Sequence, residues 1–61
     1  MDKKYLRKQY HLALLEFKTA VNEDAQWQAR ETMASLERTA LELFGEDFVN
    51  ELRKENGLEQ Y

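Results

Sequence analysis

Few side chains in this sequence of 61 residues are able to act as a nucleophile or a general base. Cysteine is absent, His11 is the only histidine and Ser35 is the only serine. A nucleophile requires a base that lies within hydrogen-bond reach and is itself oriented by a third group. No carboxylate stands four residues before or after His11, and no histidine stands near Ser35 in the sequence. We therefore predict no catalytic residue.

The carboxylates in the second half of the chain have the wrong spacing for a metal site. The candidates are Glu31, Glu37, Glu42, Glu46 and Asp47. Helical bundles bind metals through a Glu-x-x-His motif on facing helices, and that spacing does not occur here. The sequence also lacks a glycine-rich loop that would hold a phosphate group. These patterns predict a protein that is not an enzyme and that has no metal or cofactor.

Basic and acidic side chains are unevenly distributed, although the formal net charge is only −3. Residues 1–20 contain five basic and two acidic side chains, whereas residues 21–61 contain four basic and ten acidic ones. The simplest interpretation is attraction between antiparallel helices, within one chain or between subunits. The alternative is that a basic cluster contacts phosphates or an acidic protein. This cluster consists of Lys3, Lys4, Arg7, Lys8 and His11.

The composition is that of a helical protein. Proline is absent, and the only glycines are Gly45 and Gly57. Alanine, leucine, glutamate, lysine, arginine and glutamine dominate, and these residues have the highest helix propensities. We therefore predict an all-α protein in which residues 1–61 form a single small domain.

Two long amphipathic helices are expected, because apolar residues recur at steps of three and four along both. The first should cover about residues 3–21, with a face made of Leu6, Tyr10, Ala13, Leu14, Phe17, Ala20 and Val21. The second should cover about residues 23–44, with a face made of Ala25, Ala29, Met33, Leu36, Ala40, Leu43 and Phe44.

A short third helix is expected over about residues 46–55. Its apolar side consists of Phe48, Val49 and Leu52. Asn22 is a suitable N-cap for the second helix, and Gly45 should end that helix in the left-handed conformation. Gly57 should end the third helix in the same way, with Leu58 folding back onto it.

The junction between the long helices contains neither glycine nor proline, so residues 3–44 could instead form one continuous helix. In such a helix the two apolar faces would point roughly a quarter to a third of a turn apart at ~100° per residue. The apolar seam of the first helix would also run into Asp24, Glu31 and Arg38, which is incompatible with a coiled coil. We therefore favour an antiparallel helical hairpin.

Each long helix has a second apolar stripe behind the first. The stripes are Tyr5 and Leu12 with Leu15 beside them, and Trp27, Ala34 and Leu41 at steps of seven residues. A lone hairpin buries one stripe per helix, and exposed apolar patches usually mark interaction sites. We therefore expect a homodimer that completes a helical bundle, with Tyr5, Leu12, Leu15, Trp27 and Leu41 as contact residues. The alternative is a compact monomer in which the third helix covers both stripes.

These patterns favour a helical protein-interaction module of the regulator, adapter or inhibitor type, which binds itself or another protein. Lys4, Arg7 and Lys8 would steer an acidic partner toward it. The alternative is a nucleic-acid-associated transcriptional regulator that uses the basic start of the first helix. The third helix, with four acidic and two basic side chains, is unsuited to reading DNA. No apolar run reaches the ~20 residues that span a bilayer, so we expect a cytoplasmic protein without a membrane anchor.

Overall fold

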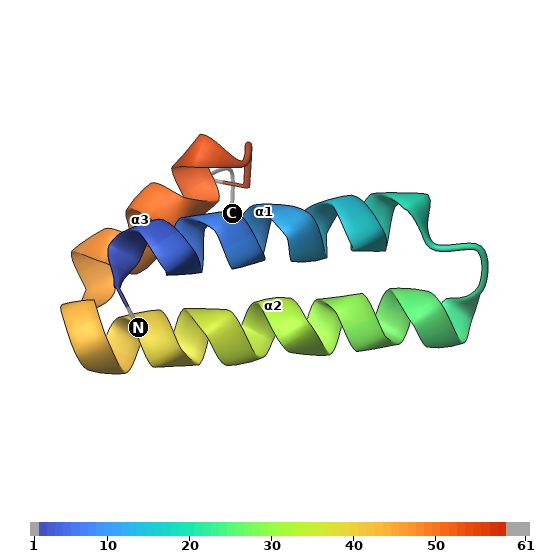
Figure 1. Ribbon diagram of the computed structural model, residues 1–61, viewed down its shortest axis with the longest axis horizontal. Helices are drawn as coiled ribbons and strands as arrows, with labels where there is room; N and C mark the ends of the chain where they lie inside the picture. Colours follow the sequence, from blue (N-terminus) through green and yellow to red (C-terminus); the bar gives the residue numbers. More distant parts are fainter. Residues whose placement is uncertain (1, 59–61) are drawn as a thin grey trace.

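The computed structural model describes residues 2–58, and these form three helices and no strand. Helix α1 covers Lys3–Thr19, α2 covers Glu23–Phe44 and α3 covers Glu46–Glu55. Helices α1 and α2 pack side by side and run antiparallel, and α3 lies across the end where α1 begins and α2 finishes (Figure 1). The predicted all-α hairpin with a short third helix is therefore confirmed. None of the helices within residues 2–58 has the length and hydropathy needed to cross a bilayer.

Side-chain caps define where the two long helices begin. The backbone N–H of Tyr5 donates a 2.8 Å hydrogen bond to the Asp2 side chain, and that of Ala25 donates one of 2.8 Å to the Asn22 side chain. Each cap satisfies an amide that has no acceptor within its own helix. The Asn22 cap was expected from the sequence, whereas the Asp2 cap was not.

Three residues connect α1 to α2, which rules out the continuous helix. Ala20 leaves the helical conformation with φ −60° and ψ 136°, so α1 ends at Thr19 rather than at Val21. The Val21 side chain is 91% exposed, and its predicted place on the apolar face is wrong. The Asn22 cap starts a new helix in the opposite direction. Val21 therefore lies in the turn and not in the interface between α1 and α2.

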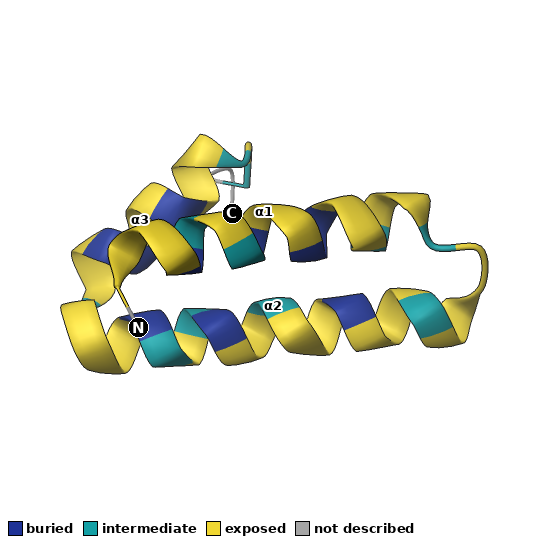
Figure 2. Ribbon diagram, in the orientation of Figure 1, coloured by how far each residue is buried: buried dark blue, intermediate teal, exposed yellow. Residues whose placement is uncertain are grey.

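The core lies between the hairpin and α3. It consists of Leu6, Tyr10, Ala13, Leu36, Ala40, Phe48, Val49 and Leu52, with Met33 and Leu58 packed against it. Figure 2 shows the buried residues on the facing sides of the helices and exposed residues on the outer sides of α1 and α2. The three apolar residues of α3 are all buried, so this helix supplies much of the core despite its short length.

The end of α2 differs from the predicted apolar face. Leu43 is 53% exposed and Phe44 is 36% exposed. Leu43 lies in the last turn of α2, where the hairpin ends. The Phe44 ring instead contacts the Phe48 ring edge-on, with 5.2 Å between centroids.

Two glycines direct the chain around α3. Gly45 has φ 90° and ψ 176°, a region that is essentially restricted to glycine and that differs from the left-handed helical conformation expected from the sequence. Gly57 has φ 75°. The Leu58 amide donates a 2.7 Å hydrogen bond to the Arg53 carbonyl, which is the pattern of a Schellman cap. The predicted return of Leu58 onto the third helix is confirmed.

Candidate interaction surface

A carboxylate between α2 and α3 joins all three helices. The Tyr10 hydroxyl donates a 2.6 Å hydrogen bond to Glu37 Oε2, and Arg53 Nη2 donates one of 2.6 Å to Glu37 Oε1. Burial of Tyr10 raises the pKa of its phenol well above the ordinary value, and the Glu37 carboxylate raises this pKa further. The same carboxylate raises the pKa of the Arg53 guanidinium. The Tyr10 hydroxyl, the Glu37 carboxylate and the Arg53 guanidinium each have a partner within this group, which therefore has a structural role.

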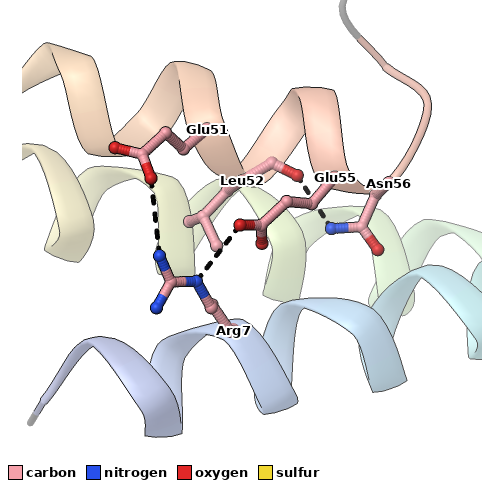
Figure 3. A network of polar contacts seen from close by, with 5 residues as sticks. All are labelled: Arg7, Glu51, Leu52, Glu55 and Asn56. Atoms are coloured by element: carbon pink, nitrogen blue, oxygen red, sulfur yellow. Dashed lines mark hydrogen bonds and ion pairs between the residues drawn. The ribbon is translucent and has the colours of Figure 1, made fainter.

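Arg7 forms a second link, between α1 and α3. Figure 3 shows its guanidinium reaching from α1 toward two carboxylates on α3. Its nitrogens lie 3.4 Å from Glu51 Oε1 and 3.3 Å from Glu55 Oε2. Its guanidinium carbon also lies 5.3 Å from the centroid of the Phe48 ring, within the range of a cation–π contact. Attraction between opposite charges thus operates between α1 and α3, whereas the sequence interpretation placed it between antiparallel helices, within one chain or between subunits.

Of the three residues proposed to steer a partner, Arg7 is engaged within the chain, whereas Lys4 and Lys8 are exposed. Neither lysine forms an ion pair with another residue in the range 2–58. His11 Nδ1 lies 3.2 Å from the Asn56 side-chain oxygen. The Asn56 amide nitrogen in turn donates a 2.8 Å hydrogen bond to the Leu52 carbonyl, drawn in Figure 3. His11 is thus an exposed residue that contacts the end of α3.

All five residues expected to contact a partner are exposed. They are Tyr5, Leu12, Leu15, Trp27 and Leu41. The structure does not bring them together, however, because the packed faces of α1 and α2 point toward each other. A stripe behind the packed face of α1 therefore lies on one outer side of the hairpin, and a stripe behind that of α2 lies on the other. They form two separate surfaces, and a single partner helix could not cover both.

The outer strip of α2 has the more exposed apolar side chains of these two surfaces. We use this name for Trp27, Ala34 and Leu41, which are exposed and separated by steps of seven residues. Trp27 is 59% exposed and Leu41 is 50% exposed. Ala34 also lines an open groove of about 610 Å³ beneath α3. The strip therefore borders the concave side of the molecule.

Sequence reasoning missed the basic side chains around that groove. They are Arg30, Arg53 and Lys54, and they lie with Glu37 around a floor that includes Met33 and Leu58. The total charge of the third helix concealed Arg53 and Lys54, because its four acidic residues outnumber its two basic ones. Glu51 and Glu55 turn toward Arg7, whereas Arg53 turns toward Glu37. Sorting the charges of this helix by face would have revealed the separation.

Within residues 2–58 no three histidine, cysteine or carboxylate side chains are grouped closely enough to hold a metal ion. No protein-family model matches the chain, and no curated protein or solved structure shows significant similarity to it.

Proposed function

We propose that this chain is a small helical protein-interaction module that associates with itself through the outer strip of α2. The exposure of Trp27, at 59% of its surface, is the observation that carries the proposal. Tryptophan is enriched at binding hot spots, because one rigid ring removes a large area from water at low entropic expense. Leu41, on the same strip, is half exposed as well. By analogy, such a surface suits a regulator, an adapter or an inhibitor.

The outer side of α1 is a less suitable surface for self-association. Lys4, Lys8 and Leu15 lie on neighbouring turns of the same side of α1, at steps of four and seven residues. Two copies of this side paired in parallel directions would bring lysines together, and like charges repel. The outer strip of α2 is instead flanked by residues of both signs, which include Glu31 and Arg38. Charges of both signs allow two identical surfaces to pair.

The nucleic-acid alternative gains no support from the geometry. Arg7, at the centre of the basic cluster, is held between Glu51 and Glu55. Two carboxylates therefore lie beside the positions where phosphates would bind, and they would repel them. We do not propose a second function.

The test is the concentration dependence of mass and fluorescence. Sedimentation equilibrium should show the mass rising toward twice that of the monomer between low micromolar and near-millimolar concentration. Trp27 is the single tryptophan, so its emission should shift to shorter wavelength over the same range as it leaves water. A constant monomer mass with unshifted emission would refute self-association through this strip.

Trp27→Ala and Leu12→Ala provide a matched pair of variants, since both remove an exposed apolar side chain from a long helix. We expect Trp27→Ala to remain monomeric and Leu12→Ala to associate as the unchanged protein does. Circular dichroism should show equal helicity in all three proteins. If Trp27→Ala abolished the helical signal, Trp27 would belong to the core of the monomer and the proposal would be wrong.

A further inference from the structure

The outer strip of α2 is symmetric about Ala34. Trp27 and Leu41 each lie seven residues from Ala34, or about 10.5 Å along the helix axis at 1.5 Å per residue. If two copies of α2 crossed at Ala34 in antiparallel directions, Trp27 would lie against the partner's Leu41 at both ends of the contact. The small alanine at the centre would let the two helix backbones approach closely. In this arrangement large side chains of one copy face large side chains of the other, and the small alanines face each other. A second copy of the chain therefore fits the strip.

The charges beside the strip match a second copy as well. Glu31 and Arg38 are exposed and lie on the flank of the strip that points away from α3. When two identical helices pair in antiparallel directions, the same flank of each copy meets its counterpart. Pairing at Ala34 places Glu31 within one residue of the level of the partner's Arg38, and the reverse pair forms by symmetry. Opposite charges therefore meet twice on this flank.

Opposite charges also meet on the flank nearer α3. It carries Arg30 and Glu37, and the antiparallel arrangement brings Arg30 to the level of the partner's Glu37. Glu37 is already bound by Tyr10 and Arg53 within its own copy, so its position is defined before association. The flank with Glu31 and Arg38 is free of such internal bonds among residues 2–58 and is the better place for a test.

We propose that two copies of this chain pair through antiparallel α2 helices that cross at Ala34, with reciprocal contacts between Glu31 and Arg38. This inference rests on the proposed self-association, and it names the partner surface and its direction. The arrangement has closed two-fold symmetry, so it ends at a dimer rather than continuing into a filament.

Disulfide trapping tests the crossing point, since the natural chain contains no cysteine. Ala34→Cys should form a covalent dimer under mild oxidation, because two cysteines at the symmetry axis can reach the ~3.8 Å Cβ separation of a disulfide. Ser35→Cys is the control, as it lies one residue further and points about 100° away from the strip. Equal trapping of both variants, or none of Ala34→Cys, would overturn the crossing at Ala34.

Charge reversal tests the direction. Glu31→Arg and Arg38→Glu should each raise the dimer dissociation constant about tenfold, since each replaces two attractive pairs by repulsive ones. An equimolar mixture of the two single variants should associate as tightly as the unchanged protein, because both pairs are again of opposite sign. Parallel helices would place Glu31 beside the partner's Arg30, and mixing would then restore nothing. Failure of the mixture to associate would therefore contradict the antiparallel arrangement.

The two proposals fail in different ways. Association that requires Trp27 but shows no Ala34→Cys trapping and no rescue on mixing would leave the proposed function standing and overturn the antiparallel pairing. A mass that stays monomeric at every concentration would overturn both. Helicity measured for each variant by circular dichroism separates a loss of pairing from a loss of folding.

Discussion

The Tyr10 hydroxyl lies 2.6 Å from Glu37 Oε2, and this hydrogen bond connects α1 to α2 at the point where α3 joins them. The other carboxylate oxygen of Glu37 accepts from Arg53 at 2.6 Å, so a single side chain joins the three helices. The Tyr10 side chain is fully buried, and an unpaired hydroxyl there would be unfavourable. This contact places α3 over the hairpin and leaves the outer strip of α2 open.

The first prediction concerns the ionisation of Tyr10. Burial, reinforced by Glu37, raises the pKa of its phenol above the ordinary value of 10.0. In the unfolded chain the phenol loses its proton at the ordinary pKa, whereas in the folded chain it keeps it. The unfolded state therefore binds fewer protons, and the free energy of unfolding falls as the pH rises above about 10. Chemical denaturation at a series of pH values measures this slope.

Tyr10→Phe is the control for that measurement. Its free energy of unfolding should be lower by about 1–2 kcal/mol at neutral pH, because Glu37 loses a donor. Its further decrease above pH about 10 should be smaller, because one group with a raised pKa is gone. The same alkaline slope in both proteins would show that Tyr10 is not responsible for it.

The second prediction concerns Gly45. A Cβ atom at this position would meet no atom within 4 Å, so the effect of an alanine substitution must come from the backbone. Gly45→Ala should lower the free energy of unfolding by about 1–3 kcal/mol, since φ 90° with ψ 176° is strained for an L-residue. Thermal denaturation followed by circular dichroism gives the difference.

Two further substitutions separate backbone strain from other causes. D-alanine at position 45, introduced by chemical synthesis, should restore the stability, because positive φ is favourable for a D-residue. Asparagine should be tolerated at Gly57, where a left-handed helical cap is expected, but not at Gly45, because asparagine favours only the left-handed helical region. If D-alanine and L-alanine destabilised position 45 equally, the strain argument would be wrong.

The third prediction concerns Arg7. Arg7→Met should lower the free energy of unfolding by about 1 kcal/mol, because it removes two partly exposed ion pairs and a cation–π contact. It should leave the dimer dissociation constant unchanged, since Arg7 acts within the chain. The effect on stability should shrink in high salt, which screens exposed charges. Lys4→Met is the matched control and should change neither quantity, whereas weaker association of Arg7→Met would return Arg7 to the interaction surface.

Local sequence determined the helices and most of their ends. Leu6, Tyr10 and Ala13 repeat at helical spacing and are buried, since such spacing places side chains on one side of a helix whatever lies opposite. Asn22 and Gly57 act as caps because their preferences depend only on the neighbouring backbone. The outer strip of α2 could be recognised from its sequence for the same reason.

Tertiary structure decided how those surfaces face one another. Arg7 was predicted to steer a partner, yet α3 brings Glu51 and Glu55 within 3.4 Å of it. The stripes of α1 and α2 were both predicted to contact a partner, yet the facing helices turn them to opposite sides. Contacts such as that between Tyr10 and Glu37 join residues 27 positions apart. Their formation depends on the path of the chain through the turn at 20–22 and through Gly45. The spacing of apolar residues within one helix does not determine that path.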